Sequence, residues 1–280
     1  MGFKFANVAG RSALIDAGGA WYDAERVSAG AIAADPMTAL GSPDALHAAA
    51  ALLAGASSDG ALADADVRAP VPTPRSVFGV GLNYASHAAE SGVELPENPV
   101  VFTKFPSCIV GPTSDVELRS TTGDYEVELV VVIGGDTRDV AEDRAWEHVL
   151  GLTVGQDISD RALQFAAQPA HFDLGKSRDT YGPIGPVLVS TDGFDDPTDL
   201  ALRSEINGEP RQNDRTSNLI FSVAQLVSYL SSIMTLRTGD LIFTGTPEGV
   251  GVASRSFLAP GDVITSTIDG IGTMTNRCVE

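Results

Sequence analysis

The sequence has little cysteine and little positive charge. Among its 280 residues are two cysteines, Cys108 and Cys278, and neither stands at a CxxC or other zinc-binding spacing. Two such distant cysteines do not form a disulfide framework, so a reducing cytoplasm is the expected compartment. Eighteen Lys and Arg against 37 Asp and Glu give a formal net charge of −19. This balance repels phosphate backbones and anionic lipids, so we expect no nucleic-acid or membrane partner.

Long apolar runs are also absent from the sequence. The most apolar stretch, residues 48–56, is mostly alanine and is too short to cross a bilayer. The first residues lack the basic and then apolar layout of a signal peptide. With 43% hydrophobic and 20% charged residues, the composition is that of a globular protein. We therefore expect a soluble, cytoplasmic protein.

Two regions that differ in composition and in predicted secondary structure follow each other along the chain. Residues 1–70 are predicted to form a small α+β domain, with a helix that begins at the N-cap Ser42 and stops at Gly55. Residues 71–280 are β-rich, with Gly and Pro at short intervals. We place the boundary in the proline-rich segment 69–75, and the density of predicted strands favours a folded-over β-sheet roll with few helices for the larger domain.

Short apolar runs predict the elements of both regions. One amphipathic helix is predicted over residues 222–231. The predicted strands cover residues 3–8, 20–22, 77–80, 100–103, 125–133, 151–156, 187–189, 202–206, 241–244 and 263–268.

The strongest chemical signal is the segment DYEVELVVVIGG over residues 124–135. Residues two apart on a strand share a face, so Glu126 and Glu128 point the same way at the start of a strand that is otherwise apolar. Two carboxylates there would repel each other and lose hydration, and a hard cation such as Mg²⁺ would remove both penalties. The alternative interpretation is an exposed strand end with solvated charges.

A third carboxylate, Asp157, follows the apolar strand in GLTVGQDIS and could bring another oxygen ligand to the same place. A turn or helix N-cap aspartate is the alternative. No basic partner for these three acids is obvious in the sequence. No histidine stands at a metal-ligand spacing, which argues against zinc.

Other candidate groups are a histidine–glutamate pair and two of the three lysines. His87 and Glu90 are three residues apart in NYASHAAE, so on a helix they share a side, and the carboxylate could orient the imidazole as a general base. A surface pair without function is the alternative. Lys176 lies in a Gly/Pro-rich loop that could aim an ammonium group at an oxyanion. Lys104 could instead be a solvated loop lysine.

These segments, in this order, resemble the fumarylacetoacetate hydrolase family, particularly its short bacterial members. The matching blocks are GLNYASHAAE, VFTKFPSCIVGP, DYEVELVVVIGG, GLTVGQDIS, GKSRDTYGPIGP, NGEPRQ and RTGDLIFTGTPEGVG, which together span about residues 77–252. The resemblance implies that residues 71–280 form a catalytic domain with a mixed β-sandwich roll. It also implies a homodimer or higher oligomer and a Mg²⁺ or Mn²⁺ ion (sometimes Ca²⁺). The implied ligands are Glu126, Glu128 and Asp157.

The resemblance also implies roles for single residues. His87 and Glu90 match the family's water-activating pair, Lys176 matches its oxyanion lysine, and Thr246 matches a residue near the substrate carboxylate. Asn83 stands where longer members carry an additional aspartate ligand, so three protein ligands are expected. The segment HFDLGK also departs from familiar members and leaves the substrate open.

The implied activity is hydrolysis of a carbon–carbon bond in an acylpyruvate-type 2-oxo acid, similar to fumarylacetoacetate or fumarylpyruvate. The products would be pyruvate and a carboxylic acid. Decarboxylation of oxaloacetate-like acids, isomerisation of 2-hydroxyhepta-2,4-diene-1,7-dioate and related steps of aromatic catabolism use the same scaffold and remain open. A non-enzymatic binding protein would not need the histidine pair and the loop lysine.

Overall fold

The computed structural model describes residues 2–280. Its strands are β1 Lys4–Val8, β2 Arg11–Ile15, β3 Ala20–Asp23, β4 Gly60–Ala61, β5 Val67–Arg68, β6 Val77–Gly81, β7 Val100–Thr103, β8 Ile109–Val110, β9 Val116–Glu117, β10 Gly123–Asp124, β11 Val127–Ile133, β12 Val149–Gln156, β13 Ser159–Asp160, β14 Gly182–Val189, β15 Ala201–Ile206, β16 Glu209–Arg215, β17 Leu241–Phe243, β18 Val263–Ile268 and β19 Gly272–Val279. Its α-helices are α1 Ala24–Val27, α2 Pro36–Leu40, α3 Pro43–Ala50, α4 Ala85–Ser91, α5 Arg161–Gln164, α6 Phe172–Gly175, α7 Val223–Ile233 and α8 Gly251–Ser254.

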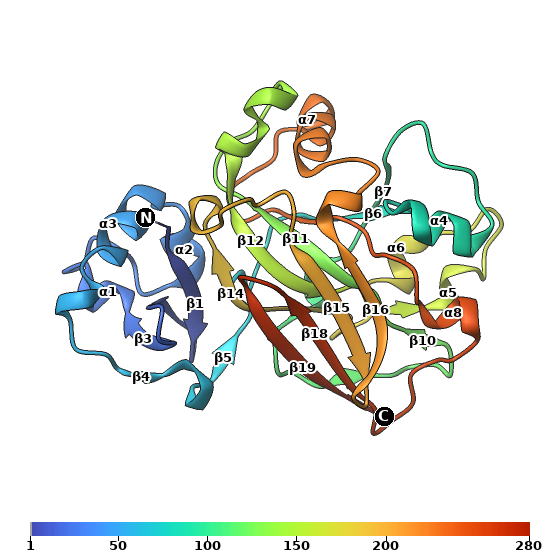
Figure 1. Cartoon of the computed structure of the whole chain (residues 1–280), viewed down its shortest axis with the longest axis horizontal. Helices are drawn as coiled ribbons and strands as arrows, with labels where there is room; N and C mark the ends of the chain where they lie inside the picture. Colours follow the sequence, from blue (N-terminus) through green and yellow to red (C-terminus); the bar gives the residue numbers. More distant parts are fainter. Residues whose placement is uncertain (1) are drawn as a thin grey trace.

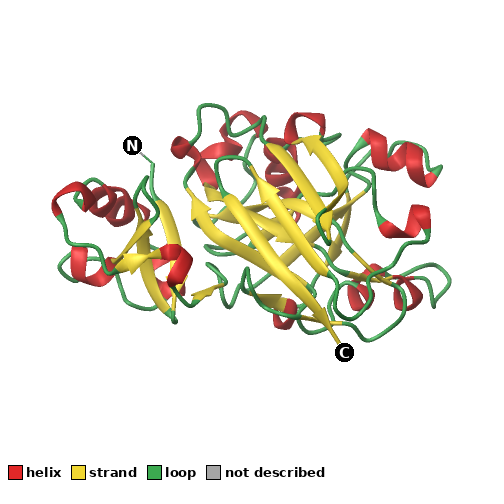
Figure 2. Cartoon of the chain, turned by 60° about the horizontal axis from the view of Figure 1, so that its bottom comes forward, coloured by secondary structure: helices red, strands yellow, loops and turns green. Residues whose placement is uncertain are grey.

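Two mixed sheets form the body of the protein (Figure 1). The larger sheet has the order β4-β3-β2-β1-β14-β12-β11-β17-β6-β7, and the smaller one has the order β16-β15-β18-β19-β9. Strands β11, β12 and β14 pack against β15, β18 and β19, so apolar side chains from both sheets share one core. Figure 2 shows the helices outside these strands. The predicted β-rich, mixed sandwich is confirmed.

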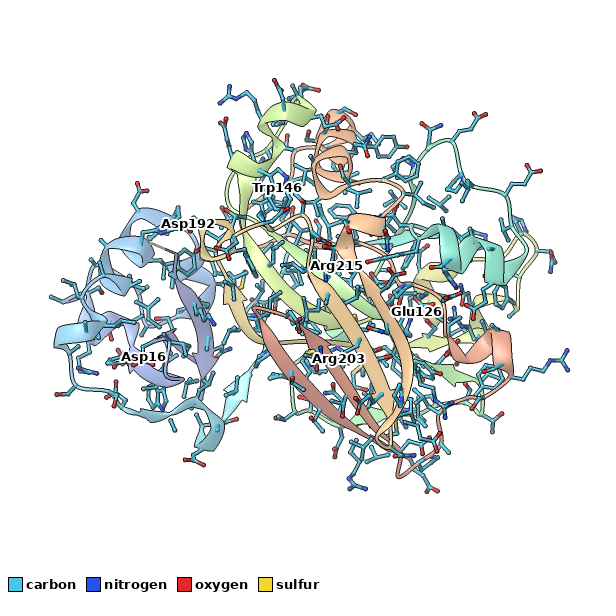
Figure 3. All side chains as sticks on the ribbon, in the orientation of Figure 1. Asp16, Glu126, Trp146, Asp192, Arg203 and Arg215 are labelled. Carbon is cyan, nitrogen blue, oxygen red and sulfur yellow. The ribbon has the colours of Figure 1, made fainter. Side chains whose placement is uncertain are left out.

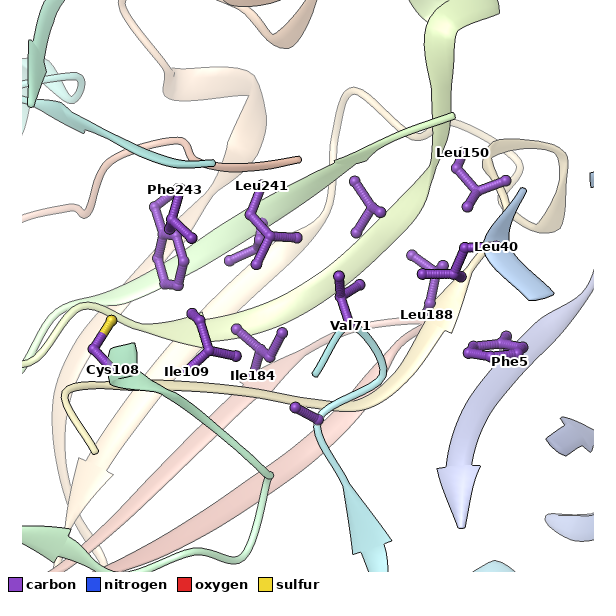
Figure 4. Close-up of a cluster of buried hydrophobic side chains, with 14 of the residues drawn as sticks. Phe5, Leu40, Val71, Cys108, Ile109, Leu150, Ile184, Leu188, Leu241 and Phe243 are labelled. Carbon is purple, nitrogen blue, oxygen red and sulfur yellow. The ribbon is translucent and has the colours of Figure 1, made fainter. Parts of the chain in front are cut away.

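The N-terminal residues form a separate lobe in outline but extend the larger sheet (Figure 2). Strand β1 pairs with β14 through Lys4↔Val189 and Phe5↔Leu188. The proline-rich segment between the two regions is also packed: Val71 is fully buried beside Leu40 and Leu188 (Figure 4). The division into domains 1–70 and 71–280 stays a prediction, because the sheet and the core continue across it.

Most predicted elements occur where the sequence placed them. Among the strands of five or more residues, β2, β16 and β19 were not predicted. In β16 the burial pattern is mostly exposed, and in β19 a polar residue, Asn276, occupies a core position, so neither strand carries a clean apolar alternation. The helix predicted up to Gly55 ends at Ala50 instead, and Ser42 makes no capping hydrogen bond. A tighter turn after Ala50 brings Leu53 into the core.

Within residues 2–280, none of the helices combines the length and the apolar character needed to cross a bilayer.

Candidate active site

Three carboxylates meet where two central strands end. Strands β11 and β12 are antiparallel neighbours with Val127 opposite Gln156, so Glu126 precedes one strand beside the point where Asp157 follows the other. The backbone N–H of Asp157 donates to the carbonyl of Glu126 at 2.9 Å. Glu128 lies two residues along the same strand, and carboxylate oxygens of all three residues lie within 4.8 Å of one another. The structure therefore brings together the three predicted acids, and all are buried.

Basic side chains from distant parts of the chain contact two of these acids. Glu126 accepts hydrogen bonds from Lys176 Nζ at 2.5 Å and from Arg161 Nη2 at 2.6 Å. Lys176 Nζ also donates to Asp157 at 2.9 Å. Burial alone would raise the pKa of Glu126, but Lys176 and Arg161 lower it to about 2. These basic partners were not obvious in the sequence, because they lie on or beside short helices far from the strand along the chain.

Glu128 is the member of the cluster that no basic side chain of residues 2–280 pairs with. It accepts the backbone N–H of Gly245 at 2.7 Å. Burial, and then the nearby charges of Asp157 and Glu126, raise its pKa well above the usual value. The donor set of three oxygen acids with one uncompensated member suits a hard divalent cation, which prefers carboxylate oxygen.

Lys104 is buried beneath the cluster. Its Nζ donates to Asp157 Oδ1 at 2.6 Å, to the carbonyl of Tyr181 at 3.1 Å and to the carbonyl of Lys176. Its side chain is 0% exposed. The interpretation of Lys104 as a solvated loop lysine is therefore wrong: it holds a predicted metal ligand and the backbone of the loop that carries Lys176.

His87 and Glu90 lie together on helix α4. Their side chains meet at 3.3 Å between His87 Nδ1 and Glu90 Oε2, as the three-residue spacing predicts. Glu90 Oε1 accepts the backbone N–H of Gly249 at 3.1 Å, which holds the carboxylate in place. Because the carboxylate accepts, Nδ1 carries the proton and Nε2 is the nitrogen that can receive one.

Thr246 follows strand β17 and lies beside the start of β11. Its hydroxyl donates to the carbonyl of Val127 at 2.8 Å and accepts from Gln212 Nε2 at 2.7 Å. Asn83 is not part of the carboxylate cluster. Its amide bonds to the carbonyl of Thr244 and to both backbone groups of Phe221, so it fixes the chain near the site.

One cavity of about 190 Å³ brings most of these groups together. Figure 1 shows α4, α5, α6 and α8 on this side of the molecule, and Figure 3 places Glu126 beside them. The lining residues form a polar set of Ser91, His87, Glu126, Glu128, Arg161, Gln164, Lys176 and Thr246, and an apolar set of Val80, Gly81, Leu82, Val93, Phe102, Phe165, Phe172 and Val252. The apolar set was not predicted from the sequence.

Arg161 was given no role by the sequence analysis. It bridges two carboxylates, since Nε donates to Asp124 at 2.8 Å while Nη2 donates to Glu126. Asp124 in turn accepts the backbone N–H groups of Gly251 and Val252 at 2.6 and 2.9 Å. This network connects the carboxylate cluster to helix α8, and the only sequence signal for it was the acid–base pair at positions 124 and 161.

Comparisons with known proteins identify the family to which this architecture is similar. Residues 76–279 match the family model of the fumarylacetoacetate (FAA) hydrolase C-terminal domain. A fumarylacetoacetate hydrolase domain-containing protein 2 homolog from Dictyostelium discoideum is 41% identical over 224 residues, which cover 75% of this chain and 73% of that protein.

Solved structures extend the similarity to the full chain. Maleylpyruvate hydrolase from Sphingobium sp. SYK-6, in complex with manganese(II) and pyruvate, is 28% identical with a TM-score of 0.82, covering 99% of this chain and 98% of its own. The 2-hydroxyhepta-2,4-diene-1,7-dioate isomerase from Mycobacterium marinum is 32% identical with a TM-score of 0.75, covering 100% and 98%. The chain therefore belongs to the fumarylacetoacetate hydrolase family.

Proposed function

We propose that the protein hydrolyses a carbon–carbon bond of an acylpyruvate-type 2-oxo acid and releases pyruvate and a carboxylic acid. The observation that carries this proposal is that one cavity is lined by Glu126 and Glu128 of the carboxylate cluster, by Lys176, and by His87, whose imidazole contacts Glu90. Hydrolysis needs a base for water, a cation for the 2-oxo acid and a donor for the oxyanion. The similarity to a maleylpyruvate hydrolase supports the same reaction class.

Glu126, Glu128 and Asp157 would hold the divalent cation, Mg²⁺ or Mn²⁺, with Ca²⁺ also suited to oxygen ligands. When bound, the ion supplies Lewis-acid stabilisation of negative charge that develops on the 2-oxo acid. Without the ion, burial destabilises the charged form of Glu128, because this carboxylate has no ionic partner. The similarity to a structure solved with manganese(II) supports a divalent ion at this position.

His87 would act as the general base. Its Nε2 takes a proton from water, whose oxygen attacks the acyl carbonyl carbon. Glu90 accepts from Nδ1 and so stabilises the imidazolium that forms. The bond between the acyl carbon and the adjacent methylene then breaks, and its electron pair remains on the methylene. The proton from His87 converts this carbon to the methyl group of pyruvate.

Lys176 and Thr246 would position the charged parts of the substrate. The Lys176 ammonium group already lies between Glu126 and Asp157, and burial, which would lower its pKa, is outweighed by these two acids, which raise it. It therefore stays charged and can donate to an oxyanion in the cavity. Thr246 lines the same cavity, and we propose that it lies near the carboxylate end of the bound substrate.

Isomerisation is the second candidate, and the similarity to a dioate isomerase favours it over decarboxylation. Hydrolysis and isomerisation both use a base, but isomerisation and decarboxylation leave no water oxygen in a released acid. Incubation of acylpyruvates in ¹⁸O-labelled water decides between them: hydrolysis places one label in the released carboxylic acid. Formation of CO₂, or of an isomer of unchanged mass, in place of a labelled acid would refute the hydrolase proposal.

We also propose that the chain forms a homodimer, as the family resemblance implies. The edges of its two open sheets offer strands for pairing. Light scattering that gives a mass of 29.1 kDa at a dilution where activity is complete would contradict this proposal.

A further inference from the structure

We infer that the substrate carries an apolar group, alkyl or aryl, at the end remote from its 2-oxo acid. This inference rests on the proposed function, because it specifies the acyl part of the acylpyruvate. It separates this chain from enzymes whose substrates end in a second carboxylate, as maleylpyruvate does. Three features of the cavity support this inference. They are the apolar residues of its wall, the acidic partners that its basic side chains already have, and the negative charge near its exposed lining residues.

The wall of the cavity changes from buried and acidic to exposed and apolar. Glu126 and Glu128 are 5% and 2% exposed, whereas Phe165 and Val93 are 51% and 49% exposed although both line the cavity. The apolar side chains therefore reach the mouth, and the acids lie at the floor. A substrate that binds the floor through its 2-oxo acid places its other end against apolar side chains.

Aromatic side chains give this wall a defined shape. The rings of Phe102 and Phe172 meet edge to face, with centroids 5.6 Å apart and an interplanar angle of 66°. Gly79 leaves the room for this arrangement, because a Cβ there would lie 2.3 Å from Phe102 Cζ. Such a wall favours an alkyl or aryl group through contact and the hydrophobic effect.

Every basic side chain that lines the cavity already has an acidic partner. Arg161 donates to Asp124, Glu126 and Gln164, and its three guanidinium nitrogens are all used. Lys176 donates to two acids of the cluster, and His87 contacts Glu90. Arg161 and Lys176 both contact the carboxylate cluster that would hold the cation, and His87 is the base of the proposed reaction. A second carboxylate on the substrate would therefore be desolvated without a cation of its own.

The charge of the rim opposes a second carboxylate as well. The loop that carries Val93 also carries Glu94 and Glu97, and both are exposed. They place negative charge one and four residues after the lining residue Val93, in a protein whose formal net charge is −19. Like-charge juxtaposition disfavours a ligand that brings an additional negative charge.

The test compares acylpyruvates of equal length whose far end is either a methyl group or a carboxylate. Their dissociation constants are measured by calorimetry on His87→Ala with saturating Mn²⁺, so that the ligands are not consumed. Pyruvate release by the unaltered enzyme is measured in parallel. We expect the methyl-ended ligand to bind about 100-fold more tightly, because the carboxylate-ended ligand must desolvate an unpaired charge.

Substitutions at the mouth show whether this wall is responsible. Phe165→Arg and Val93→Arg each place a cation at an exposed lining position, and each should reduce the preference about fivefold or more. Phe105→Arg is the matched control, because Phe105 is 49% exposed in the same region but does not line the cavity. This control should leave the preference unchanged.

The outcomes separate the inference from the proposed function. Equal or tighter binding of the carboxylate-ended ligand overturns the inference, whichever reaction runs. Tighter binding of the methyl-ended ligand without pyruvate release from either leaves the inference standing and overturns the hydrolase proposal. If Phe105→Arg changes the preference as much as the two lining variants do, the apolar wall is not its source and the inference is overturned. If neither ligand binds, both fail.

Discussion

Replacing Lys104 by methionine tests how much the buried ion pair beneath the carboxylate cluster stabilises the fold. Methionine keeps most of the length of the side chain and removes its charge. Asp157 Oδ1 then loses its donor at 2.6 Å, and the carbonyl of Lys176 loses its ammonium partner. Asp157 Oδ2 keeps the hydrogen bond from Lys176 Nζ, and the Tyr181 carbonyl keeps the N–H of Ile158.

The size of the loss follows from these contacts. Removing one partner of a buried ion pair costs about 3–5 kcal/mol, and the remaining bonds place this case at the lower end. A loss of about 3 kcal/mol lowers the melting temperature of a chain of this size by about 6–12 °C. Adding Asp157→Asn to Lys104→Met should recover part of the loss, since the double variant no longer buries a carboxylate that has lost one of its two ammonium partners.

The assay is thermal unfolding followed by circular dichroism, with Lys4→Met as the matched control. Lys4 lies at the partly exposed start of β1, so the same chemical change there should alter stability by less than about 0.5 kcal/mol. A melting temperature for Lys104→Met equal to that of Lys4→Met would refute the reasoning. So would a double variant whose loss is the sum of the two single losses.

Three further predictions concern the site. His87→Ala should lower turnover by about 10²- to 10⁴-fold with little change in metal affinity, and Glu90→Gln should give a smaller loss; steady-state kinetics and metal titration measure both. Saturating Mn²⁺ should raise the melting temperature by about 5–11 °C at a hundredfold excess over its dissociation constant, and full activity after exhaustive chelation would contradict a metal requirement. Gly79→Ala should cost about 1–3 kcal/mol and raise KM for apolar substrates, because its Cβ displaces the Phe102 ring; an unchanged KM would contradict that position for the ring.

The sequence predicted the carboxylate cluster because strand geometry alone determines much of it. Glu126 and Glu128 share a face by the two-residue period, and the antiparallel pairing of β11 with β12 then brings Asp157 to them. The contact between His87 and Glu90 followed in the same way from the helical three-residue spacing. Local periodicity was sufficient for both.

Contacts between distant loops could not be predicted in this way. Lys104 meets Asp157 across 53 residues, and no local pattern separates a buried loop lysine from a solvated one. The apolar wall could not be predicted for the same reason, because Phe102 and Phe172 come from distant segments and meet only in the folded chain. The strand β19 was missed because Asn276, a buried polar residue bonded to the Ser114 carbonyl, interrupts its apolar alternation.

The pairing of β1 with β14 means that the N-terminal lobe covers part of a strand edge in the larger sheet. Strand β14 lies in the middle of the larger sheet. Without β1, part of its edge would present unpaired N–H and C=O groups to solvent. Such an edge recruits strands from other molecules. The lobe therefore works as an edge cap: a chain shortened to residues 71–280 would keep every predicted site residue and still tend to aggregate.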